Sequence, residues 1–242
     1  MDNRQNKNTK QFSVITSIGS RCFTEIFLKK LNYKKFSSPF DALYLRKVDD
    51  IIEIFENNIE YSSLLHTEDM ENDEIISKLN KIHGKRSIYN KMIDYKINNS
   101  EHLYHGATFA HHNLKEHKNI EHFERCFDRL NKIKINKIKT LFCLFLFPFY
   151  GSKYSPYINI SLQDIYKLEK YLISNYNCKL LVVSFTDKNF KILESNETLM
   201  YVNINDTSNP ESSFEKNEIL LNKIFEINNI KQENLLNYDY FI

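Results

Sequence analysis

The stretch "FSVITSIGSRCFTEIFLKKLN", residues 12–32, decides the fold because its periodicity changes at a single glycine. Residues 12–19 are apolar, rich in β-branched side chains, and end at Gly19, which is typical of a buried strand. From Cys22 onward, apolar residues recur at helical spacing and predict a helix of about three turns. A strand, turn and helix of this kind places the turn at the carboxyl edge of a parallel sheet, where open α/β folds bind ligands.

Apolar strands and amphipathic helices alternate through the second half of the chain as well. We predict helices over 48–58, 119–134, 161–176 and 213–228, the third capped by Ser161, and strands over 139–147, 179–185 and 198–205. Strands that are apolar throughout and alternate with helices are typical of a parallel sheet covered on both faces. We therefore predict a polar flexible tail over residues 1–11. A single α/β domain follows over 12–242, with a mainly parallel sheet flanked by helices on both faces.

Composition and charge narrow the class of protein. The 242 residues include 33 basic and 31 acidic side chains, a net charge of +2, which argues against a nucleic-acid surface. The polar start of the chain predicts no signal peptide, and the apolar run over 140–150 is too short to span a bilayer. Four cysteines without a C-x-x-C pair favour a reducing compartment. We expect a cytoplasmic protein that binds neither nucleic acid nor membrane, and the pattern leaves its oligomeric state open.

Cys22 is the first candidate for chemistry because it stands in the first turn of a predicted helix. The helix dipole and the unpaired N–H groups of that turn favour a thiolate, and Arg21 beside it acts in the same direction. The same N–H groups could bind an oxyanion. The alternative is a small buried thiol, which is the usual place of an unpaired cysteine.

A nucleophilic cysteine needs a base, and the histidines are confined to residues 66–122. The tightest group is "FAHHN", residues 109–113, where His111 or His112 could serve. Asp41, in "SSPFD" at 37–41, could orient the imidazole or cap the next helix. On local grounds the two histidines could equally be surface residues, and the cap is the simpler role for Asp41.

Zinc and nucleotide sites have weaker support in the sequence. His122 and Cys126 share a helical face, with His117 nearby, but a matching second ligand pair is missing. The chain has neither a Walker-type P-loop nor a G-x-G-x-x-G motif. We therefore expect no metal and no cofactor.

Two of these motifs, taken together, resemble a known family. Ser17-Ile18-Gly19-Ser20-Arg21-Cys22 and Ser37-Ser38-Pro39-Phe40-Asp41, followed by Phe109-Ala110-His111, are similar to the pattern of the family called "putative papain-like cysteine peptidases". The resemblance covers roughly residues 12 to 190. It implies a thiol-dependent hydrolase in which Cys22 is the nucleophile, His111 the base and Asp41 the third member, and it names no substrate. Because a second histidine follows directly, His112 remains an alternative base.

Two other classes of protein remain open at this point. In the first, an α/β binding module without catalysis, Gly19 makes a turn and Cys22 packs. In the second, an esterase of the SGNH type, Ser20 is the nucleophile, but such enzymes carry a histidine near the carboxyl terminus and this chain has none after His122. A peptide or other acyl compound is the substrate class that the cysteine interpretation implies.

Overall fold

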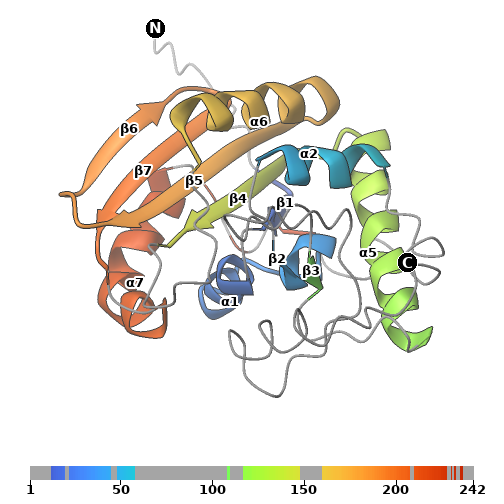
Figure 1. Ribbon diagram of the computed structural model, residues 1–242, viewed down its shortest axis with the longest axis horizontal. Helices are drawn as coiled ribbons and strands as arrows, with labels where there is room; N and C mark the ends of the chain where they lie inside the picture. Colours follow the sequence, from blue (N-terminus) through green and yellow to red (C-terminus); the bar gives the residue numbers. More distant parts are fainter. Residues whose placement is uncertain are drawn as a thin grey trace, which may run out of the picture.

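The computed structural model of the chain is an assembly of strands and helices in alternation (Figure 1). It describes residues 12–19, 22–44, 48–57, 108–109, 117–147, 160–207 and 210–227, with residues 230, 232, 235 and 236. The strands are β1 (Val14–Ser17), β2 (Leu43–Tyr44), β3 (Thr108–Phe109), β4 (Thr140–Leu146), β5 (Cys178–Thr186), β6 (Lys191–Ser195) and β7 (Leu199–Asn205). The helices are α1 (Cys22–Lys30), the 3-10 helix η1 (Pro39–Ala42), α2 (Val48–Asn57), α5 (His117–Ile135), α6 (Leu162–Asn175) and α7 (Pro210–Ile227).

Five of the strands form one sheet in the order β1-β4-β5-β7-β6. The pairs β1·β4, β4·β5 and β5·β7 are parallel, and β6 pairs with β7 in the antiparallel direction. The predicted α/β class with a mainly parallel sheet is confirmed. The strand β6 is absent from the sequence prediction, because its side chains are almost all exposed and show no apolar run.

The two core clusters explain why β4 is apolar along its whole length. Phe142 and Leu144 belong to a cluster that includes side chains of α2, α5 and α6. Leu141, Cys143 and Phe145 belong to a second cluster, which includes side chains of α1 and α7. Figure 1 shows α2 and α6 on the opposite side of the sheet from α1 and α7. Since successive residues of a strand point to opposite faces, β4 is buried on both.

Helix α6 begins where the sequence predicts. Ser161 is its N-cap: the Ser161 hydroxyl accepts from the Asp164 N–H at 3.1 Å, and the Asp164 carboxylate accepts from the Ser161 N–H at 2.9 Å. This reciprocal capping box satisfies two N–H groups at the start of the helix. The hydrogen bonds from Ser161 lower the pKa of Asp164 below its usual 3.8.

The buried side-chain amide of Asn203 connects the carboxyl ends of β5 and β7. Asn203 is 4% exposed, and its Oδ1 accepts from Ser184 Oγ at 3.1 Å and from Thr186 Oγ1 at 2.7 Å. Its Nδ2 donates to the carbonyl oxygens of Lys188 at 2.9 Å and Asn189 at 3.0 Å. The amide thereby ties the β5–β6 connection to β7 without any charge.

Within the described ranges, none of the helices combines the length and the apolar character that crossing a bilayer would require.

Candidate functional site

The residues on either side of the turn between β1 and α1 have the backbone that the sequence predicts. Strand β1 ends at Ser17, Gly19 has a φ of 101°, and α1 begins at Cys22. A φ in this range favours glycine, which explains why a residue without a side chain stands at this point of the turn. The side chain of Cys22 and residues 20–21 lie outside the described part of the chain.

The first turn of α1 is tied to both neighbouring strands by one buried hydroxyl. Thr24 Oγ1 donates to the Gly19 carbonyl at 3.2 Å and accepts from the Phe145 N–H of β4 at 3.1 Å. Thr24 is completely buried. These two hydrogen bonds fix the helix start relative to the carboxyl ends of β1 and β4, so the backbone on both sides of residues 20–21 is held in place.

The Ser-Ser-Pro-Phe-Asp motif forms a 3-10 turn that its own side chains close. Ser38 Oγ accepts from the Phe40 N–H at 3.3 Å, and the Asp41 carboxylate accepts from the Ser38 N–H at 2.6 Å. The prediction that Asp41 caps the next helix is therefore wrong. Helix α2 begins only at Val48, and Asp41 instead closes the turn to which it belongs.

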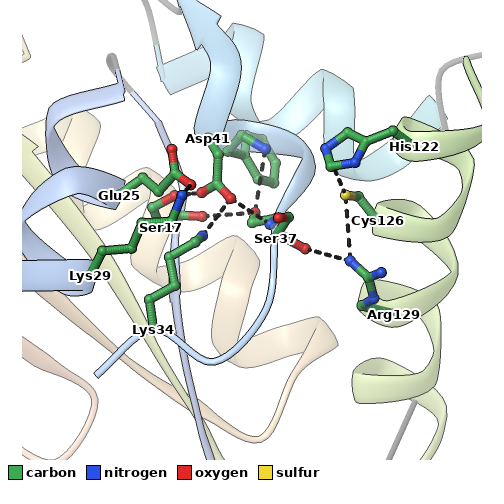
Figure 2. Close-up of polar contacts among 11 residues, drawn as sticks. Ser17, Glu25, Lys29, Lys34, Ser37, Asp41, His122, Cys126 and Arg129 are labelled. Carbon is green, nitrogen blue, oxygen red and sulfur yellow. Dashed lines mark hydrogen bonds and ion pairs between the residues drawn. The ribbon is translucent and has the colours of Figure 1, made fainter. Parts of the chain in front are cut away.

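Asp41 also joins this turn to the end of β1 (Figure 2). Ser17 Oγ donates to Asp41 Oδ1, while the Lys34 ammonium forms an ion pair with Asp41 Oδ2. Ser38 Oγ in turn donates to the Ser17 carbonyl at 3.0 Å. The side chains of Lys34 and Asp41 are 1% and 7% exposed. The first two sequence motifs are thus joined through one buried polar cluster, which consists of Ser17, Lys34, Ser38 and Asp41 and is called the Asp41 cluster below.

Helix α5 holds the same turn from its other side. Arg129 Nη1 donates to the Ser37 carbonyl at 3.0 Å and lies 3.6 Å from Cys126 Sγ. His122 Nε2 lies 3.7 Å from that sulfur, as Figure 2 shows. His117 contacts Glu121 at 3.1 Å instead of joining this pair. Among the described residues, no three His, Cys, Asp or Glu side chains gather in a way that could hold a metal ion.

The three free thiols whose side chains are described are poor nucleophiles. Burial raises the pKa of Cys126 to about 11, against the opposing charge of Arg129. Burial likewise raises the pKa of Cys178 to about 12, and it raises that of Cys143, which is completely enclosed. Because the thiolate is the reactive form, all three are expected to be inert at neutral pH.

A comparison with known families matches residues 13–145, more than half of the chain, to the family described as "Putative papain-like cysteine peptidase (DUF1796)". The chain belongs to this family. The resemblance inferred from the motifs is confirmed, although the match ends within β4 and is shorter than the expected range of 12 to 190. The comparisons found no curated protein and no solved structure that matches the chain.

The family match contains all four predicted site residues, but the structure describes them unequally. Cys22 has a described backbone at the start of α1, and Asp41 is buried in the Asp41 cluster. His111 and His112 lie outside the described residues. The strand that precedes them is described: Phe109 of β3 pairs with Leu43 of β2.

Sequence reasoning missed Lys34, the partner of Asp41. In the sequence it is half of a Lys-Lys pair after a helix, a pattern typical of an exposed surface. The signal that could have found it is the unpaired acid of the Ser-Ser-Pro-Phe-Asp motif, since a buried carboxylate needs a cation or several hydrogen-bond donors. Which lysine supplies the charge depends on the tertiary fold.

Proposed function

We propose that the chain is a thiol-dependent hydrolase in which Cys22 is the nucleophile, His111 or His112 the base, and Asp41 the third member of the site. The observation that carries the proposal is the start of α1 at Cys22, five positions after β1 ends at Ser17. A thiol in this position has the unpaired N–H groups of the first helical turn beside it. Membership in a family described as peptidase-like supports the same class of reaction.

The register of the short β2·β3 sheet supports the assignment of a histidine to this site. Leu43 pairs with Phe109, Asp41 stands two residues before Leu43, and His111 stands two residues after Phe109. Because the two strands are antiparallel, both the acid and the histidine continue from the same end of the pair. Two residues span at most about 7 Å, and we therefore infer a histidine near that end of the strand pair.

The reaction follows from the roles of these groups. The Cys22 thiolate attacks a carbonyl carbon to form a C–S bond, and N–H groups of the α1 start stabilise the oxyanion. Collapse of this intermediate breaks the bond to the leaving amine or alcohol, which takes the proton from the histidine. A water molecule, deprotonated by the same histidine, then attacks the thioester and releases the carboxylic acid. The thiol is restored, and no oxidant or cofactor is consumed.

Selective labelling of Cys22 tests the proposal. A fluorescent iodoacetamide at pH 6.5 is expected to modify Cys22 in the native protein before the other cysteines, as read by mass spectrometry of the tryptic peptides. A thiol with a pKa of about 11 is only about three parts in a hundred thousand ionised at pH 6.5, so Cys126 supplies a slow internal reference.

Two variants give the controls for this experiment. Cys22→Ala is expected to lose the fast labelling phase, whereas Cys178→Ala, which removes another thiol with a raised pKa, is expected to keep it. If Cys22 labels as slowly as Cys126 and Cys178, the proposal is wrong. Faster labelling of Cys22 in native protein than in urea-unfolded protein at the same pH would show that the fold creates the reactivity.

A non-catalytic binding module is the second candidate, and one observation favours it. Asp41 already accepts hydrogen bonds from Ser17 and the Ser38 N–H and pairs with Lys34, so its burial is explained without a histidine. Under this alternative the Asp41 cluster only joins two loops, and Cys22 should show no fast labelling phase.

A further inference from the structure

The Lys34 ammonium is buried where an ordinary lysine would reach water. Its side chain is 1% exposed, and the backbone N–H of Lys34 donates to the Leu28 carbonyl at 3.2 Å, which anchors the residue to the end of α1. A lysine held in this way cannot extend its charge to the surface as exposed lysines do. Its charge is instead directed at Asp41 Oδ2.

We propose that Lys34 is a positioning residue of the Cys22 site, which holds the Asp41 carboxylate in place and compensates its charge. This inference rests on the function proposed above. The two carboxylate oxygens have separate partners: Oδ1 faces Ser17 at the end of β1, and Oδ2 faces Lys34 and the Ser38 N–H. Because both oxygens have fixed partners, the carboxylate has a single orientation. In that orientation it connects its own turn to β1, the strand that precedes Cys22.

The charges of Lys34 and Asp41 also affect the pKa values of neighbouring thiols. At Cys126, on α5, the Asp41 carboxylate raises the thiol pKa while Arg129 and Lys34 lower it, although burial is the largest influence. At Cys143, on β4, Lys34 also opposes the effect of burial on the pKa. Lys34 therefore offsets the negative charge of Asp41 at Cys126, and at Cys143 it opposes only the effect of burial. Without that cation, the carboxylate would disfavour a thiolate nearby.

Removing the charge with little change in size distinguishes positioning from packing. Lys34→Met keeps most of the length of the side chain and leaves Asp41 without its cation. The double variant Lys34→Met/Asp41→Leu removes both charges, which often restores stability to a buried ion-pair site. Asn203→Ala is the matched control, because it disrupts a buried polar cluster of the same sheet that lies outside the proposed site.

The measurement is the rate of iodoacetamide labelling of Cys22 from pH 5 to 9, with native structure checked by circular dichroism. We expect Lys34→Met to move the midpoint of the profile up by about one pH unit, which slows labelling about tenfold at a pH well below the midpoint. The double variant should also label slowly, because the positioned carboxylate is gone. Asn203→Ala should keep the wild-type midpoint.

Each other outcome overturns the inference. If the double variant labels at the wild-type rate, the positioned carboxylate does not contribute to the reactivity of Cys22, and the positioning role of Lys34 is wrong even if Lys34→Met fails to fold. A shift in Asn203→Ala equal to that in Lys34→Met would mean that lost stability, not lost charge, causes the change. An unreactive Cys22 in the wild-type protein overturns the proposed function and this inference together, whereas a reactive Cys22 with an unchanged Lys34→Met profile overturns this inference alone.

Discussion

Two buried polar clusters lie at the carboxyl ends of the parallel strands. One is formed around a neutral amide and the other around an ion pair. At β5 and β7, Asn203 satisfies two hydroxyls and two carbonyls with a neutral amide. At β1, the Asp41 cluster buries a full negative and a full positive charge for a similar set of connections. Burying an ion pair costs more desolvation energy than burying an amide.

A charge is not required to hold a loop at the end of a strand, because a neutral amide connects the β5–β6 loop to β7. The amide at Asn203 performs that task beyond the end of the family match, which stops at residue 145. The charged cluster lies inside the match, beside the turn that leads to Cys22. The difference is explained if the β1 end does chemistry and the β7 end does not, and the following changes test this contrast.

The largest effect is expected from breaking the ion pair on one side only. Lys34→Met should lower the free energy of unfolding by about 3–5 kcal/mol, because it leaves a buried carboxylate without its cation. Asp41→Leu alone should cost a similar amount, since the ammonium of Lys34 is then unpaired. Urea unfolding followed by circular dichroism measures both.

The double variant Lys34→Met/Asp41→Leu is the informative control for this prediction. It should recover most of the loss, to within about 2 kcal/mol of the wild type, since two apolar side chains can replace a buried ion pair. A double variant as unstable as the two single variants added together would show that the charges do not interact in the folded protein.

A smaller loss is expected at the neutral cluster. Asn203→Ala leaves the Lys188 and Asn189 carbonyls without their donor and should cost about 2 kcal/mol in urea unfolding. Asn205→Ala, on the exposed end of the same strand, should change the stability by less than about 0.5 kcal/mol. Equal losses of stability in Asn203→Ala and Asn205→Ala would contradict the view that Asn203 stabilises the connection between the β5–β6 loop and β7.

Much of the frame can be predicted from the sequence where one local signal decides it. The glycine turn, the start of α1 at Cys22 and the cap at Ser161 are fixed by short-range chemistry and are found where expected. Strands β4 and β5 can be recognised from their continuous apolar runs, because both strands are buried on both faces. The strand β6 is not predictable in this way, since pairing with β7 and not an apolar pattern makes it a strand.

The site is less predictable because its contacts join distant segments. The two motifs indicate that Asp41 belongs to the candidate site. Its partners Ser17 and Lys34 are determined by the tertiary fold, which places the turn beside β1. The hydrogen bond from Arg129 to Ser37 crosses from α5 in the same way. Residue types alone cannot tell a lysine that becomes buried against an acid from one that remains in water.

A loss smaller than that of Asn203→Ala is expected at an exposed charged cluster, the capping box of α6, and this loss depends on pH. Ser161→Ala should cost about 1 kcal/mol, the usual value of a helix cap. The pKa of Asp164 is lower in the folded chain than its usual 3.8, so the folded state binds fewer protons there. Its stabilising effect is therefore fully present above about pH 3.8 and is lost as the pH falls through the lower folded value.

Thermal unfolding of the wild type and of Ser161→Ala between pH 2.5 and 7 measures this contribution. The difference in stability between the two should become smaller at the acid end, because protonation of Asp164 weakens the hydrogen bond from the Ser161 hydroxyl to its carboxylate, while the bond from the Asp164 N–H to that hydroxyl remains. The loss of stability in Lys34→Met comes from the buried Lys34–Asp41 ion pair and not from the exposed Asp164 carboxylate. The stability losses of Lys34→Met and Ser161→Ala should therefore depend on pH independently of each other. A Ser161→Ala effect that stays constant down to pH 2.5 would mean that the serine hydroxyl caps the helix by itself, without help from Asp164.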